Sequence, residues 1–517
     1  MKTKRLVVGK VERSWLVGAV LVTLIYFSWW LNWDNGDNKV MYGLLFGTEV
    51  YHVLSSLLFW ITIWPLSRGK RKQLVLRREL NLGQQPSVDV FITVAGEPVE
   101  VVEKTVRAAR DMDYGNHKVF ILNDGYVAKK DNWEEIRDLA LREGVNCITR
   151  EIPGGAKAGN VNNGLRLTEG EYVTILDADM IPQKEYLKTL LSYFDRPEIG
   201  FVQSPQFYQN SRENEVTRGA WQQQEFFFGP IMAGKGQLNS AFICGTNFLI
   251  KREALVGVGG LNETNIAEDF VTSVKVHQAG WTSRYTTEIL AKGLAPEDLM
   301  SYYKQQLRWA RGSLEVLFAQ NPLFMKGLSW GQKWQYIFSA LYYLNGIIVF
   351  VDIAVPLFFL MTGISPVKTS SSNFAFYFIP YILLTFLIIN SISRGRLTFR
   401  AISFSYSSWW LQIIALISVI TGKKMGFSVT PKTKQNGDYS ALAYPHMAYV
   451  GLSMIGFLVA MYREGLSAGV VTNIAWVSFN ILIFWPFIKT ALGWSPREVG
   501  VPVGQEVAVV EVKSRNG

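Results

Sequence analysis

The sequence predicts a cytosolic α/β domain with a mostly parallel sheet, inserted between two groups of membrane-spanning α-helices. Three observations support this fold class. Apolar stretches long enough to cross a bilayer lie near both ends of the 517-residue chain, which is 49% hydrophobic. Strand-like runs alternate with helical stretches in the middle. Basic residues gather beside the apolar stretches, as they do on the cytoplasmic flanks of membrane helices.

Six segments reach the roughly 20 apolar residues that a helix needs to cross a bilayer. They are 14–32, 43–65, 335–362, 374–393, 440–461 and 467–489. The first follows a basic N-terminus, as the apolar part of a signal peptide does. However, no small-residue cleavage site follows it, and it ends on the interfacial pair Trp29-Trp30. We therefore expect an uncleaved first membrane helix.

The segment 401–421 is also long enough to cross, but its flanks argue against crossing. Arginines from Arg394 to Arg400 precede it and lysines from Lys423 onward follow it, so crossing would leave one basic flank outside. We expect residues 400–422 to form an amphipathic helix in the cytoplasmic interface. Six spans then place both termini and the central domain on the cytoplasmic side of the plasma (inner) membrane.

Residues 84–330 have the pattern of a soluble α/β domain. It lies between membrane regions at 1–83 and 331–496, and a short tail follows at 497–517. Strands are predicted at 89–94, 118–122, 146–149, 172–176 and 200–203, and helices at 99–112, 133–142, 157–167 and 184–194. This alternation implies right-handed crossovers and a mostly parallel sheet. Ligands of such sheets bind outside the carboxyl ends of the strands.

Composition excludes several classes of function. The net charge of +10 comes largely from basic residues beside apolar spans, so it does not indicate nucleic-acid binding. Two cysteines, Cys147 and Cys244, make neither a disulfide framework nor a zinc site, and the four histidines are scattered. Catalysis must therefore depend on carboxylates, lysine, arginine and aromatic residues.

Four short clusters of polar residues follow one another at strand ends, at a helix start and in a basic, aromatic stretch. They are Asp124, Asp177-Ala178-Asp179, Glu268-Asp269 and Gln305-Gln306-Leu307-Arg308-Trp309. Each has an ordinary structural explanation. The aspartates suit plain turns, the acid pair answers a helix dipole, and the last cluster suits an interfacial helix. Four such clusters in this order are much more specific than any one.

The order and spacing of the clusters resemble the signature of processive family 2 glycosyltransferases, the cellulose, chitin and hyaluronan synthases. The resemblance implies a Rossmann-like glycosyltransferase domain and covers roughly residues 85–490. Three further segments narrow it to bacterial cellulose synthase catalytic subunits: Gln224–Gly229, Phe242–Thr246 and Phe427–Lys432. The chain departs from those proteins in two ways, with two spans before the domain and no cyclic-di-GMP-binding barrel after the last span. We expect it neither to bind that nucleotide nor to be activated by it.

A sugar-nucleotide donor carries a diphosphate whose charge must be neutralised before it can leave. Asp177 and Asp179 stand one residue apart on a strand-end turn, and this pair suits Mg²⁺ or Mn²⁺ held against both phosphates. Lys157 follows the glycine-rich turn Gly154-Gly155 and starts a helix, an arrangement that suits a phosphate. The alternative for Lys157 is a solvated side chain beside a flexible loop.

The resemblance also assigns roles to the remaining acids. Asp124 would contact the nucleotide base or ribose, although Asn123 stands where many cellulose synthases have a second aspartate. Inverting transfer needs a base for the acceptor proton. Asp269, next to Glu268, matches the base of the family's acid pair, and Ala267 replaces the usual threonine before it.

The last residues implied by the resemblance concern the acceptor and a gate. Arg308 would pair with the leaving diphosphate, Trp309 would stack on the acceptor sugar, and Gln305 begins the same motif. Cys244 would line the acceptor end, or be a small buried apolar residue. A gating loop at 423–438 would close over bound nucleotide through Phe427, Val429, Thr430 and Lys432.

These expectations describe a membrane-embedded, processive, inverting enzyme that elongates a β-glucan from UDP-glucose and secretes it through its own spans. A β-1,4-glucan is the first expected product, while mixed-linkage, β-1,3-glucan and mannan products stay open. So do a lipid-acceptor glycosyltransferase that adds one sugar and a transporter with a nucleotide-sensing domain. The expected partners are the UDP-sugar, the growing β-glycan, the lipid bilayer and accessory secretion subunits, and nucleic acid is not among them.

Overall fold

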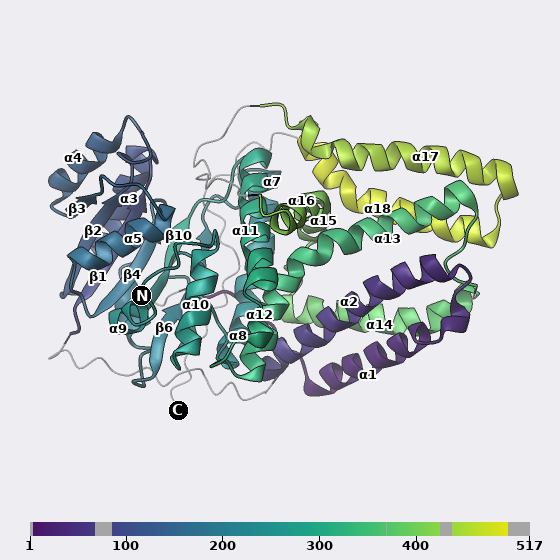
Figure 1. Cartoon of the computed structure of the whole chain (residues 1–517), viewed down its shortest axis with the longest axis horizontal. Coiled ribbons are helices and arrows are strands. Elements are labelled where there is room, and N and C mark those ends of the chain that lie inside the picture. Colours follow the sequence, from purple (N-terminus) through teal and green to yellow (C-terminus); the bar gives the residue numbers. More distant parts are fainter. Residues whose placement is uncertain (1–3, 68–84, 369, 424–436, 495–517) are drawn as a thin grey trace.

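The computed structural model describes residues 4–67, 85–368, 370–423 and 437–494. An α/β domain forms one end of the molecule and long apolar helices form the other (Figure 1). The predicted fold class is confirmed.

Within the described residues, the central sheet has seven strands in the order β3-β2-β1-β4-β8-β6-β9. They are β1 (Val88–Val94), β2 (His117–Asn123), β3 (Asn146–Thr149), β4 (Tyr172–Asp177), β6 (Ile199–Gln203), β8 (Phe248–Lys251) and β9 (Thr282–Tyr285). The first four are mutually parallel, β6 is parallel to β9, and β8 runs antiparallel to both of its neighbours. All five predicted strands are present.

The register of these strands decides where the candidate residues meet. β1 is buried along its whole length and pairs with β2 on one side and β4 on the other. Its residue Thr93 lies opposite Asp177, and Val94 lies opposite Asn123. The strand ends that carry Asp124 and Asp177 therefore lie on either side of β1, at one edge of the sheet.

Helices cover this sheet, and a small second sheet extends it. The helices are α3 (Val99–Arg110), α4 (Trp133–Glu143), α5 (Ala156–Leu167), α6 (Tyr186–Leu191), α7 (Glu215–Phe226), α8 (Met232–Gln237), α9 (Arg252–Val256) and α10 (Glu268–Gln278). The second sheet has the order β5-β10-β7, formed by β5 (Ile181–Pro182), β10 (Ala291–Gly293) and β7 (Phe207–Tyr208). The helix predicted at 184–194 is shorter than expected. The second sheet was not predicted, because two- and three-residue strands leave no periodic signal.

Two helices stand between the domain and the membrane region, and the remaining ones are apolar (Figure 1). The intermediate helices are α11 (Leu299–Ala319) and α12 (Trp330–Leu341). The others are α1 (Arg13–Trp30), α2 (Lys39–Ile63), α13 (Asn345–Thr362), α14 (Ser371–Ser393), α15 (Phe399–Ser407), α16 (Trp409–Ile420), α17 (Tyr444–Glu464) and α18 (Ala468–Ala491). Among the described residues, seven helical segments are long and apolar enough to cross a membrane, and six of them coincide with the predicted spans.

The seventh segment is α15–α16, which breaks at Ser408. Of its apolar window, 56% is buried inside the protein, against 17–39% for the other six. α15 packs on α7 and α18, and α16 packs on α11 and α13. Figure 1 shows α15 and α16 nearly end-on, whereas α13, α17 and α18 run across the view. These features are compatible with an interface helix, and that assignment stays a prediction.

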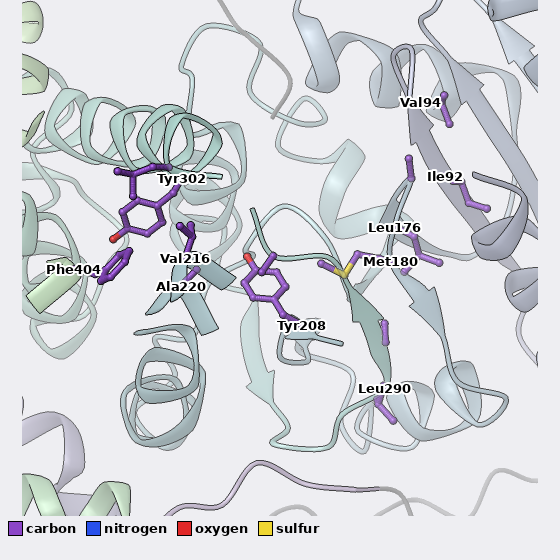
Figure 2. Packing of buried hydrophobic residues seen from close by; sticks show 14 of the residues in the cluster. Ile92, Val94, Leu176, Met180, Tyr208, Val216, Ala220, Leu290, Tyr302 and Phe404 are labelled. Carbon is purple, nitrogen blue, oxygen red and sulfur yellow. The ribbon is translucent and has the colours of Figure 1, made fainter. Parts of the chain in front are cut away.

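The domain and the membrane helices share one apolar core. Figure 2 follows it from Ile92 in the sheet, through Tyr208 and Tyr302, to Phe404 on α15. Buried side chains of the sheet and of the apolar helices belong to the same cluster. The domain is therefore held against the membrane region by direct packing.

Two polar connections reinforce this junction. The extended segment before α1 adds to the domain: Arg5 forms an ion pair of 2.8 Å with the buried Glu288, and Gly9 N donates to Ile392 O on α14. On α8, the buried Lys235 donates to the carbonyl and side-chain oxygens of Gln335 at 2.6 and 3.1 Å. Burial lowers the pKa of Lys235 to about 7.

Candidate active site

A lysine and an aspartate meet at the carboxyl end of β4. Asp177 is the last residue of β4, and Lys157 lies in the first turn of α5, after a turn in which Gly155 has φ +63°. The ammonium of Lys157 donates to Asp177 Oδ1 and, at 2.8 Å, to the carbonyl of Gly245. Burial opposes protonation of Lys157, but Asp177 and Glu268 outweigh it and raise its pKa. Lys157 is therefore a fixed cation at the sheet edge.

The predicted acid pair opens α10 beside this lysine. Burial, followed by the charge of Glu268, raises the pKa of Asp269 to about 7, and burial also raises the pKa of Glu268. One oxygen of Asp269, Oδ1, accepts from Phe270 N at 2.7 Å. Asp269 is thus a weak acid whose proton affinity suits base catalysis near neutral pH.

Gly245 brings the lysine and the acid pair together. Its φ of +79° favours glycine, and a Cβ built on it would lie 3.2 Å from Asp269 Oδ2 and 3.8 Å from Lys157 Nζ. Any side chain here would enter the space between base and cation. In the sequence Gly245 belongs to the motif Phe242–Thr246, and its positive φ is visible only in the structure.

Asp124 lies past the end of β2 and is held by a partner that the sequence did not reveal. Arg150 donates to Asp124 Oδ1 at 2.6 Å and to Oδ2 at 2.7 Å, a bidentate pair. Asn123, at the position where many cellulose synthases have an aspartate, caps the same turn. Its Oδ1 accepts from Gly125 N and its Nδ2 donates to Trp133 O. Arg150 follows β3, and only the strand order shows that it reaches Asp124.

Asp177 and Asp179 have the chemistry of a divalent-cation site. The side chain of Asp177 is 35% exposed, whereas Asp179 is buried and its Oδ2 accepts from Leu294 N at 2.9 Å. Hard oxygen donors on a tight turn suit Mg²⁺ or Mn²⁺. In the described part of the chain, no group of three or more acids, histidines or cysteines could hold a metal ion. A cation between these two aspartates would keep coordination positions for phosphate oxygens, so the pair fits such an ion.

Helix α11 carries the last motif to the same place. Gln305, Arg308 and Trp309 are all half-buried, and their spacing of three and four residues puts them on one helix face. Arg308 lies near enough to the acid pair that its charge opposes the rise in the pKa values of Glu268 and Asp269.

Helix α11 packs closely against Ala267, the residue before the acid pair. A Cβ built on Gly312 of α11 would lie 2.6 Å from the Cβ of Ala267. The helix therefore runs directly over residue 267, where alanine leaves room for this close approach.

Cys244 precedes Gly245 and borders the site. Burial, followed by the charge of Asp269, raises the pKa of its thiol. Cys244 is therefore a thiol of low reactivity, near enough to Asp269 to feel its charge. Its backbone N–H donates to Oε1 of the buried Gln203 at 2.9 Å, which positions the backbone of Cys244. Gln203 was not among the predicted site residues. Tyr343, at the start of the membrane helices, lies within electrostatic range of both Cys244 and Asp269. The site therefore continues toward the membrane region.

The predicted gating-loop residues lie outside the described residues. They are Phe427, Val429, Thr430 and Lys432.

A second cluster of ionisable side chains lies among the membrane helices, and the sequence analysis did not predict it. His52 on α2 is 3.2 Å from Asp352 on α13, measured from Nε2 to Oδ2, and Glu49 stands one turn before His52. The side chain of His52 is 35% exposed and that of Asp352 is 23% exposed. Ionisable residues within membrane helices usually face a bundle interior or a water-filled space.

Comparison with known proteins identifies the family of this chain. The family model for glycosyl transferase family group 2 matches residues 172–389. The cellulose synthase catalytic subunit [UDP-forming] of Xanthomonas axonopodis pv. citri is 30% identical over 93% of this chain and 68% of that protein. The protein of the same name from Pseudomonas fluorescens (strain SBW25) is 30% identical over 90% of this chain and 65% of its own length. Cellulose synthase 2 of Novacetimonas hansenii is 29% identical over 93% of this chain and 31% of its own length.

The chain thus spans about two thirds of the shorter relatives and about a third of the longer one. Among solved structures, a mannosyltransferase from Pyrobaculum calidifontis in complex with GDP-Man and Mn²⁺ shares the fold, with a TM-score of 0.54 and 17% identity over 74% of this chain and 99% of that one. The match to the Xanthomonas protein is decisive for the family, since it extends over most of both chains. The chain belongs to the cellulose synthase-like family 2 glycosyltransferases.

Proposed function

We propose that this protein is a membrane-embedded, processive, inverting glycosyltransferase that elongates a β-1,4-glucan from UDP-glucose and secretes it through its own helices. One observation carries the proposal. Lys157 and Asp269 meet at Gly245, at the carboxyl edge where Asp177 ends β4, and the charge of Arg308 acts on Asp269. A cation, a base and an arginine at one point are what glycosyl transfer from a nucleotide diphosphate needs.

In this proposal the donor diphosphate lies along the sheet edge. Asp177 and Asp179 would hold a divalent cation, which would neutralise the charge of the two phosphates. The Mn²⁺ named with the Pyrobaculum enzyme supports a divalent ion, with Mg²⁺ and Mn²⁺ both suitable. Asp124, fixed by Arg150, lies across β1 and is in place for the nucleoside.

The transfer step uses the acid pair. The acceptor hydroxyl attacks the anomeric carbon, and its proton passes to Asp269. The bond from that carbon to the diphosphate oxygen breaks, and its electron pair stays on the leaving UDP. Arg308 stabilises the charge that develops on the leaving UDP, and Trp309 supports the acceptor sugar. Burial and, after it, the charge of Glu268 keep the proton affinity of Asp269 high enough for this role.

The membrane helices supply the exit route. Tyr343 lies within electrostatic range of Asp269, and partly exposed polar side chains such as His52 and Asp352 are found among α2 and α13. Polar groups within a membrane bundle suit a hydroxyl-rich chain. This continuity favours processive elongation over a lipid-acceptor enzyme that adds one sugar. The catalytic domain and both termini would then be cytoplasmic, at the inner membrane.

The test is synthesis from radiolabelled UDP-glucose by purified protein with Mg²⁺, followed by digestion with linkage-specific glucanases. We expect a long product that a β-1,4-specific glucanase degrades. UDP-GlcNAc and GDP-mannose serve as donor controls. A product of one added sugar, or one that resists this glucanase, would refute the processive β-1,4 assignment.

A further inference from the structure

A groove lies where the α/β domain meets the outer surface of the membrane helices. Its volume is about 390 Å³, within the range of small-molecule sites. Residues from α7, from the start of α15 and from the end of α18 line it: Glu215, Thr398, Phe399, Arg400, Trp485, Pro486 and Lys489.

The polar side of the groove carries a net positive charge. Arg400 Nη2 donates to Glu215 Oε1 at 3.0 Å, so these two charges compensate each other. Lys489 comes from the last turn of α18, and no carboxylate among the described residues lies within ion-pair distance of it. The lining therefore has two cations for one anion.

The other side of the groove is apolar and uncovered. Phe399 is 52% exposed and Trp485 is 48% exposed. Trp494, 61% exposed, lies just beyond the end of α18 with its ring 6.3 Å from that of Trp485. Tryptophans at the end of a membrane-spanning helix are typical of the level where lipid headgroups meet water.

We propose that this groove binds an anionic phospholipid. Lys489 and Arg400 hold the phosphodiester, and Phe399 and Trp485 cover the first part of the acyl chains. A free phosphate would satisfy Lys489 but would leave the two aromatic side chains uncovered. The occupant therefore combines an anion with a hydrocarbon chain, the composition of a membrane lipid.

Occupancy of the groove would affect the active site through α7. Next to the groove, Thr398 donates to Gln222, and Arg396 pairs with Glu225. Between these two contacts along α7, Gln223 accepts from Tyr302 on α11, the helix that carries Arg308. A lipid that fixes α15 against α7 therefore also fixes α11, and we expect it to raise the rate of transfer.

The experiment uses the full chain and two probes, dioleoylphosphatidylglycerol and dioleoylphosphatidylcholine. Native mass spectrometry should show retention of the anionic lipid by the wild type, with at least a several-fold loss in Lys489→Gln. Lys10→Gln removes an exposed lysine before α1 and is the matched control, expected to behave as the wild type. This binding measurement does not need glycosyl transfer, so failure of the proposed function would leave it readable.

In phosphatidylcholine vesicles, added phosphatidylglycerol should raise UDP release several-fold for the wild type and Lys10→Gln but not for Lys489→Gln. All three proteins should have equal rates in phosphatidylcholine alone. Equal retention of both lipids, or unchanged retention of phosphatidylglycerol by Lys489→Gln, would overturn the proposal. Retention without activation would overturn the coupling through α7 and leave the lipid site standing.

Discussion

The two ionisable clusters of this protein are built in opposite ways. The cluster at the sheet edge lies where secondary-structure elements end or begin: Asp177 ends a strand, and Lys157 and Asp269 lie in the first turns of helices. In the membrane region, His52 and Asp352 come from the middle of two long helices, 300 residues apart in sequence. The first cluster leaves a local pattern in the sequence, because termini need turns and caps. In the second cluster, single ionisable residues stand out within apolar spans, but no local pattern shows that they pair with one another.

The difference has a functional meaning in the proposed mechanism. Groups at strand and helix ends are held rigidly and can position reacting atoms. Groups on facing helices line a space, and they can contact successive units of a moving chain. We therefore expect substitutions at the sheet edge to stop chemistry, and substitutions in the membrane cluster to slow passage of the product.

The largest expected effect is that of Asp269→Asn. It should lower polymer synthesis by roughly 10²–10⁴-fold, since it removes a general base, while UDP still binds. UDP release assays and calorimetry with UDP measure the two quantities. Synthesis near the wild-type rate would remove Asp269 from the mechanism.

Metal removal should come next. Excess chelator should abolish turnover, and Mg²⁺ or Mn²⁺ should restore it. Asp179→Ala should weaken UDP binding in the presence of the ion but change it little in the chelator, because the substitution acts through the cation. Full turnover in excess chelator would contradict the assigned site.

The membrane cluster should respond differently. Asp352→Leu should slow elongation by about tenfold, the effect of losing one charge-assisted hydrogen bond, and leave the affinity for UDP unchanged. Ser28→Ala, an exposed hydroxyl on α1, is the control. If UDP affinity falls with the elongation rate, the two clusters are not separate in function.

The acid pair also predicts a pH dependence. Because Asp269 has a pKa of about 7, the fraction of deprotonated base, and with it kcat/KM, should fall as pH drops below 7. Glu268→Gln removes a charge that raises this pKa, so the acidic limb should move to lower pH. A limb that stays in place in Glu268→Gln would show that another group controls it.

The smallest effect concerns Lys235, a buried cation at the junction of the two regions. Its pKa is about 7 in the folded protein and 10.5 for the free side chain, so between these values the unfolded chain binds the extra proton. Stability should therefore rise with pH from 7 toward 10, and Lys235→Met should flatten that rise. Thermal unfolding of detergent-solubilised protein at several pH values measures it. An equal slope in the variant would contradict a depressed pKa.

Much of the fold followed from the sequence, because hydrophobic periodicity marks strands and spans. The strands from β1 to β4 and six apolar helical segments lie where the pattern put them. The antiparallel β8 and the short β5-β10-β7 sheet did not, since pairing direction and two-residue strands leave no periodic mark.

The candidate site was predictable where residues belong to a local motif. Arg150, Gln203 and Asp352 escaped prediction because each acts on a partner distant in sequence, and only the three-dimensional arrangement pairs them. The sequence shows that residue 245 is glycine, but it does not show its positive φ or its closeness to Asp269.

The extended segment before α1 has a consequence for the order of biosynthesis. Arg5 leaves the ribosome long before its partner Glu288, which is 283 residues later in the chain. Glu288 is fully buried, and its carboxylate forms an ion pair with Arg5 and accepts a hydrogen bond from Tyr193. The segment that carries Arg5 therefore gains this partner only after most of the α/β domain has been made.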